Sequence, residues 1–125
     1  MKNKNTYEFS FEKLDVWKLS VELVKEIYKI TKKYPDEEKF GLVSQLRRAA
    51  ISVSSNLAEG SSRTTNKDKA HFTQVSFGSL MELLCQLIIS KELEFINEDE
   101  LFNLRIKIEE ISNKLNALRN YQLNK

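Results

Sequence analysis

The chain has 125 residues, the size of one ordinary domain, and its 41% apolar and 30% charged residues are typical of a folded, water-soluble protein. Three glycines and one proline are too few for the turns of a β-sandwich, a barrel or a Rossmann unit. A formal net charge of +2 excludes the strongly basic composition of many nucleic-acid-binding domains. We therefore expect one all-α domain over residues 1–125, with residues 1–10 as a flexible tail.

The first predicted helix runs from about Leu14 to Tyr34 and ends there because Pro35 follows. Its apolar residues form two neighbouring stripes that together span an arc of roughly 200°. The stripe expected to face the core comprises Leu14, Trp17, Val21, Val24, Tyr28 and Thr31. The stripe beside it comprises Val16, Leu23, Ile27, Ile30 and Tyr34. Such an arc is wider than one bundle partner can cover.

The second predicted helix begins near the acids Asp36–Glu38 and stops at Gly60. Its apolar side comprises Leu42, Val43, Leu46, Ala49, Ala50, Val53 and Leu57. A third helix is expected from about Lys67 to Glu92, and eight of the ten residues from Leu80 to Ile89 are apolar. Because apolar groups then point in nearly every direction, this helix needs cover on more than one side.

A fourth helix is expected after Asn97, because Asn97 and Glu100 have the spacing of a capping box. Its apolar residues follow steps of three and four: Leu101, Leu104, Ile108, Ile111, Leu115 and Leu118. Four helices with short connections predict an antiparallel, up-down-up-down four-helix bundle.

Targeting and membrane signals are absent from the pattern. No long apolar stretch follows the basic N-terminal residues, and no uninterrupted apolar run approaches the roughly 20 residues of a membrane span. We therefore expect a cytoplasmic protein with no membrane partner. Cys85 is the only cysteine and lies among apolar residues, which predicts a buried, inert thiol.

A polar stripe recurs on the second helix at steps of three and four residues: Gln45, Arg48, Ser52, Asn56 and Glu59. The favoured interpretation is a contact with another helix or subunit, in which Arg48 and Glu59 each pair with a partner on another helix. The alternative is a ligand or phosphate contact made by Arg47 and Arg48. The stretch from Arg47 to Lys69 holds five cations against two acids, so the candidate nucleic-acid contacts are Arg47, Arg48, Arg63, Lys67 and Lys69.

No motif predicts an enzyme. His71 is the only histidine, and the three glycines lie far apart, so neither a clustered metal site nor a glycine-rich phosphate loop is indicated. We predict no catalytic residue, no metal and no cofactor. An enzyme would instead require a deep pocket lined by convergent polar groups with shifted pKa values.

The segment Gln45–Gly60, read as QLRRAAISVSSNLAEG, resembles the signature of the bacterial four-helix-bundle family of rRNA intervening-sequence proteins. Phe11–Trp17, Tyr34-Pro35 and Gly78–Glu82 join it in the family's order, so the resemblance covers about residues 11–120. It implies an antiparallel bundle that assembles into a homopentamer, without known catalytic residues. A more distant relative is the accessory variability determinant of diversity-generating retroelements, which binds nucleic acid through a strongly basic surface.

Two functions are open at this point. The first is a noncatalytic oligomeric scaffold that binds RNA, a ribonucleoprotein or a nucleic-acid-processing protein. The second is a protein-protein adaptor that does not bind nucleic acid. In both, the protein associates with itself, because a single bundle cannot cover the wide apolar arc of the first helix and a third helix that is apolar on nearly every side. Rotational contact between copies gives a ring, and the number five comes from the resemblance alone.

Overall fold

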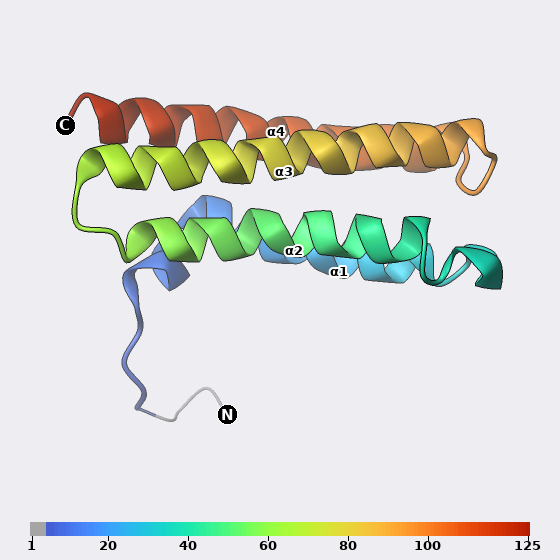
Figure 1. Ribbon diagram of the computed structural model, residues 1–125, viewed down its shortest axis with the longest axis horizontal. Helices are drawn as coiled ribbons and strands as arrows, with labels where there is room; N and C mark the ends of the chain where they lie inside the picture. Colours follow the sequence, from blue (N-terminus) through green and yellow to red (C-terminus); the bar gives the residue numbers. More distant parts are fainter. Residues whose placement is uncertain (1–4) are drawn as a thin grey trace.

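The computed structural model describes residues 5–125, and over that range it contains helices and no strand. The elements are η1 (Ser10–Lys13), α1 (Asp15–Thr31), η2 (Asp36–Glu38), α2 (Leu42–Ser61), α3 (Asn66–Glu92) and α4 (Glu98–Leu123). Figure 1 shows two layers, with α1 and α2 in one and α3 and α4 in the other. Of the tail expected over residues 1–10, residues 1–4 lie outside the described part, residues 5–9 are exposed and without helix, and Ser10 begins η1.

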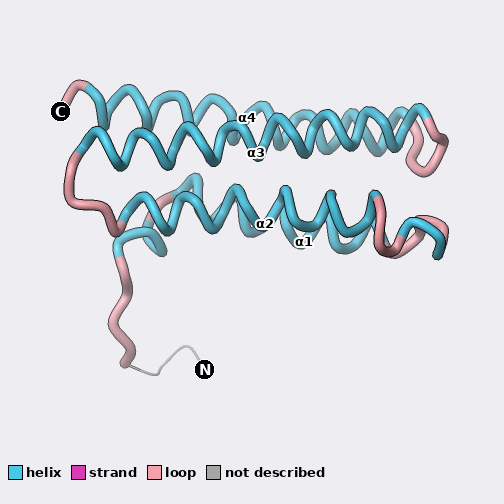
Figure 2. Tube along the Cα trace, in the orientation of Figure 1, coloured by secondary structure: helices cyan, strands magenta, loops and turns pink. Residues whose placement is uncertain are grey.

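Contacts between helices establish that neighbours run antiparallel. Ion pairs join α1 and the residues just after it to α4, and the residue numbers fall along the first segment as they rise along α4: Lys33 with Glu100, Glu26 with Lys107, and Asp15 with Lys114. The same opposition appears between α2 and α3, where Ser52 meets Ser79 and Gln45 meets Gln86. Short loops connect the helices (Figure 2). The predicted antiparallel four-helix bundle is therefore confirmed.

The core-facing stripe of α1 is not the one expected. Val16, Leu23 and Ile27 are at most 5% exposed, whereas Trp17 is half-buried and Tyr28 is exposed. The buried face also includes Ser20 and Thr31, whose hydroxyls donate to the carbonyls of Trp17 and Ile27 at 2.6 Å. Because these hydroxyls are satisfied within their own helix, burying them costs little. Counting apolar residues therefore selected the wrong stripe.

The ends of α1 and α2 also differ from expectation. α1 ends at Thr31, and the acids Asp36–Glu38 form a separate 3-10 turn instead of the start of α2. Glu38 lies outside α2 but satisfies a backbone donor at its start, because its carboxylate accepts a hydrogen bond from the Leu42 N–H at 3.2 Å. The apolar side predicted for α2 is confirmed, and its buried members are Val43, Leu46, Ala49, Ala50, Val53 and Leu57.

Gly60 does not stop α2, which continues to Ser61, but it lets α3 approach closely. A Cβ at Gly60 would lie 2.9 Å from the Phe72 Cβ, whereas a Cβ at Gly78 would meet nothing within 4 Å. Gly60→Ala is therefore expected to destabilise the protein by about 1–2 kcal/mol through overpacking. Gly78→Ala is expected to stabilise the folded subunit by about 0.5–1 kcal/mol through helix propensity. Urea unfolding of both variants checks this, and equal effects of the same sign would contradict it.

α3 is the most thoroughly packed helix on its inner side, where Leu80, Leu83 and Leu87 are 0% exposed. Among the described helices it alone is long and apolar enough to cross a membrane, with a mean hydropathy of 1.4 over 18 residues, although polar residues interrupt its apolar runs. In the bundle it packs between α2 and α4. Cys85 is exposed, contrary to the predicted buried thiol. It follows Leu83 by two residues, about 200° around the helix, and so points away from the core.

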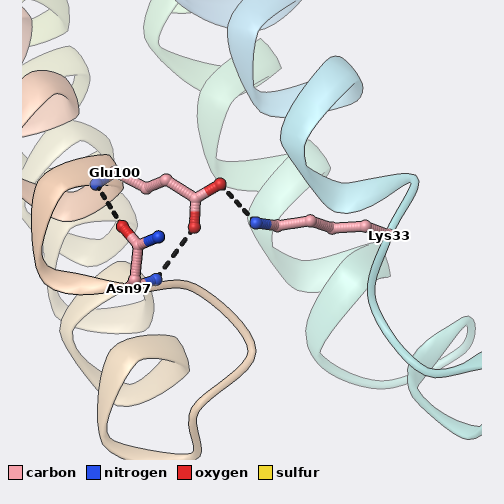
Figure 3. Close-up of polar contacts among 3 residues, drawn as sticks. All are labelled: Lys33, Asn97 and Glu100. Carbon is pink, nitrogen blue, oxygen red and sulfur yellow. Dashed lines mark hydrogen bonds and ion pairs between the residues drawn. The ribbon is translucent and has the colours of Figure 1, made fainter.

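The expected capping box forms at the start of α4, and its glutamate also binds Lys33, just after α1 (Figure 3). Asn97 Oδ1 accepts from the Glu100 backbone N–H, and Glu100 Oε1 accepts from the Asn97 backbone N–H, both at 2.8 Å. The other Glu100 oxygen accepts from Lys33 Nζ. The Lys33 ammonium and, after it, the Asn97 N–H hold the pKa of Glu100 below its ordinary value of 4.5. One carboxylate therefore joins the start of α4 to the connection just after α1.

This joint predicts an acid-sensitive contribution to stability. Because the folded-state pKa of Glu100 is lowered, its contribution is present above about pH 4.5 and is lost as the pH falls through the folded value. Glu100→Gln is expected to lower the melting temperature at pH 7 and to make a smaller difference at pH 3. Thermal unfolding at both values checks this, with the exposed Glu110→Gln as control. A difference that is the same at both pH values would contradict the assignment.

Candidate nucleic-acid interface

The outward face of α2 is free of negative charge. From Gly41 to Ala58 the sequence contains no aspartate or glutamate, and the only acid of α2 is Glu59. This face and the preceding connection line an open groove of about 720 Å³, which we call the α2 groove. Its lining contains no acid and includes Tyr28, Lys39, Phe40, Arg47, Arg48 and Ile51. Three cations thus gather beside two exposed aromatic rings.

Arg47 is held in place by α1. Its Nε donates to Thr31 Oγ1 at 3.0 Å, a terminal nitrogen lies 3.4 Å from the Tyr28 carbonyl oxygen, and the guanidinium lies 4.3 Å from the Tyr28 ring centroid. Stacking on the ring and the donated hydrogen bonds fix the orientation of the guanidinium before any ligand arrives. Arg47 therefore joins α1 to α2 and also contributes positive charge to the groove.

Arg48 and Lys39 are the more accessible cations. Both side chains are exposed, and Arg48 has no hydrogen bond or ion pair within the described residues. Lys39 Nζ lies 5.6 Å from the centroid of the Phe40 ring, and Phe40 itself is 90% exposed. Lys39 and Phe40 both belong to the short connection between η2 and α2. This connection has no inner face on which to bury a side chain.

The five predicted cations do not form one cluster. Arg47 and Arg48 lie near the start of α2, whereas Arg63, Lys67 and Lys69 follow its end, roughly 20 Å away along the helix. Arg63 pairs with Glu59 and stacks over the Phe72 ring at 4.6 Å. Lys69 Nζ donates to the Ser61 carbonyl at 3.3 Å, and Lys67 is exposed. The cations at the far end of α2 are thus partly engaged within the chain.

Two residues of the polar stripe on α2 contact another helix of the chain. The Ser52 and Ser79 hydroxyls are 2.8 Å apart, and Gln45 accepts from Gln86 at 3.3 Å, so both join α2 to α3. Asn56 donates back to the Ser52 carbonyl at 2.9 Å. Glu59 pairs with Arg63, four residues on in the connection after α2, and a partner on another subunit stays a prediction.

Three groove residues were missed as site candidates: Tyr28, Lys39 and Phe40. Tyr28 was assigned to the core-facing stripe, and the Lys39-Phe40 pair lies outside any helical period. The available signal was an aromatic residue beside a lysine that fell within the second predicted helix but off its apolar side. Such a position does not stand out when only the apolar spacing of helices is considered.

A second groove of about 380 Å³ lies between α3 and α4. Its lining includes four apolar side chains, Met81, Leu84, Phe102 and Ile106, of which Phe102 and Ile106 are 60% and 52% exposed. Arg105 and Glu109, one of each charge, also line it. We call it the α3–α4 groove, and its chemistry suits an apolar partner surface better than a polyanion.

Shifted pKa values occur away from both grooves. Burial raises the pKa of Tyr34, the Glu98 carboxylate raises that of Lys91, and the Lys33 ammonium lowers that of Glu100. None of these three residues lines the α2 groove or the α3–α4 groove.

The α2 groove is open to solvent and combines cations with aromatic rings, an arrangement suited to holding an extended anion.

Fold and surface thus define an antiparallel four-helix bundle with a basic, aromatic groove on one helix pair. The chain belongs to the 23S rRNA-intervening sequence protein family, whose model matches residues 12–117, as the resemblance predicted. A solved structure with the same fold is the crystal structure of a protein of unknown function from the S23 ribosomal protein family of Bacteroides thetaiotaomicron VPI-5482. It superposes with a TM-score of 0.77 at 20% identity, covering 83% of this chain and 97% of that one. No curated protein matches the sequence.

Proposed function

We propose that this protein is a noncatalytic, self-associating cytoplasmic bundle that binds RNA, free or within a ribonucleoprotein, through the α2 groove. The observation that carries the proposal is the composition of the groove, which has three cations, two exposed aromatic rings and no acid. Guanidinium groups bind phosphate oxygens through paired donors, and aromatic rings accept unpaired bases.

If the groove binds phosphates, the affinity for RNA is expected to fall with salt concentration by a predictable amount. Each cation that neutralises a phosphate of single-stranded RNA contributes about −0.7 to the slope of log affinity against log salt, so three cations give about −2. Fluorescence anisotropy with a labelled RNA oligonucleotide, from low to physiological salt, measures this slope. Undetectable binding at low salt would refute the proposal, and a slope near zero would refute the phosphate contacts.

Self-association is supported by exposed apolar surface on the other layer. The outward face of α3 carries Gly78 and Cys85 together with Ile89, which is 43% exposed, and α4 adds Phe102 and Ile106. Contact between identical copies would cover this surface, and the family resemblance supplies a ring of five. Light scattering on the purified protein decides the number. A monodisperse monomer at micromolar concentration would contradict self-association, and a dimer or tetramer would contradict the pentamer.

A protein-protein adaptor is the second candidate, and the α3–α4 groove favours it. Half-buried Met81 and Leu84 form its floor beside exposed Phe102 and Ile106, the kind of apolar lining that receives an amphipathic partner. Copurification from the native cell, with and without nuclease, separates the two functions. A partner that survives nuclease treatment supports the adaptor, and one released by nuclease supports RNA binding.

A further inference from the structure

Phe40 is an exposed ring on an ordered turn. Its side chain is 90% exposed, more than any other large apolar side chain of the described residues. The backbone on both sides is hydrogen-bonded, because the Lys39 N–H donates to the Asp36 carbonyl and the Gly41 N–H to the Glu38 carbonyl, each at 3.0 Å. The ring is therefore presented from a fixed backbone and is open to solvent, with the Lys39 ammonium over it at 5.6 Å from the centroid.

The neighbours of Phe40 indicate what could cover it. Lys39 Nζ lies beside the ring, and Arg48 and Ile51 line the same groove. A purely apolar partner would leave these cations facing it without a counterion, which is costly. A ligand that combines a flat π-face with negative charge satisfies the ring and the cations together, and a nucleotide has both.

We propose that the α2 groove takes single-stranded RNA, with one base stacked on Phe40 and the flanking phosphates bound by Lys39 and Arg48. This inference rests on the proposed function and narrows its ligand. Inside a duplex, each base is already stacked on its neighbours and its face is not available to a side chain. Phosphates, in contrast, are available in both forms. The ring therefore makes the groove selective for single strands, while the cations alone bind either form.

The stacking of one base on an aromatic ring raises the affinity for the nucleic acid roughly 5- to 100-fold. Phe40→Ala is therefore expected to weaken binding of an unstructured 12-nucleotide RNA by about that factor and to change binding of the same RNA annealed to its complement less than twofold. Phe40→Trp keeps a stacking surface and should retain single-strand affinity. Tyr121→Ala, which removes an exposed ring from α4 outside both grooves, serves as the matched control and should change neither affinity.

Anisotropy titrations at low salt measure all four proteins against both RNAs, with circular dichroism to verify folding. Unchanged single-strand affinity in Phe40→Ala would overturn the inference, and so would equal weakening for both RNA forms. Binding of both forms without discrimination refutes the stacking role but leaves RNA binding in place. Failure of the wild-type protein to bind either form refutes the proposed function itself, and this inference with it.

Discussion

Ile108→Ala is expected to destabilise the protein by about 2–5 kcal/mol, whereas Ile106→Ala, two residues earlier on the same helix, should cost less than about 1 kcal/mol. The side chain of Ile108 is 2% exposed and belongs to the core, whereas that of Ile106 is 52% exposed. Truncating Ile108 leaves a cavity that the closely packed core cannot fill, and a typical domain has only about 5–15 kcal/mol of stability to lose.

The two isoleucine variants are compared by urea unfolding at several protein concentrations. The substitution is identical and the helix is the same, so helix propensity cancels in the comparison. A cost at Ile106 that grows with protein concentration would support association through the α3–α4 groove. Equal losses for both variants, independent of concentration, would contradict the assignment of Ile108 to the core and Ile106 to the surface.

Lys39→Gln combined with Arg48→Gln is expected to weaken RNA binding about 10- to 100-fold at low salt. The same pair should make the salt slope shallower by about 1.4, because two phosphate contacts are lost. Both side chains are exposed, so the fold should be unaffected. Anisotropy titration over a range of salt concentrations provides both quantities.

The matched control is Arg63→Gln combined with Lys67→Gln, which removes the same charge from the far end of α2. These residues lie outside the α2 groove, so this pair should weaken binding less than about threefold through net charge alone. Equal weakening by the two pairs would mean that RNA responds to the overall charge of the protein and not to the groove. A stronger effect of the control pair would move the site to the α2–α3 connection.

How far the sequence predicts the fold differs between helices for physical reasons. α4 has one long apolar seam, with Phe102 and Ile106 off it, and its buried residues follow from the spacing of three and four along that seam. α1 has two apolar stripes, and the buried one is extended by Ser20, which hydropathy treats as polar, while Thr31, counted in the other stripe, is buried as well. Their buried hydroxyls bond to backbone carbonyls one turn back, which no hydropathy pattern records.

The candidate site was only partly predictable. Arg47 and Arg48 follow from the basic stretch of the sequence, but a stretch of 23 residues that contains most of a helix spans too great a distance to form one site. Lys39 and Phe40 join the groove because the 3-10 turn η2 directs the chain back over the start of α2. That placement depends on how the connection folds, which residue spacing does not encode.

Photo-cross-linking tests the central claim most directly. The protein and a single-stranded RNA are irradiated at low salt, digested with protease, and the RNA-bearing peptides are identified by mass spectrometry. The account predicts adducts at Phe40 and within residues 39–55, the connection and outward face that line the α2 groove. Adducts confined to α4 or to residues 63–69, or none at an RNA concentration that saturates binding, would contradict it.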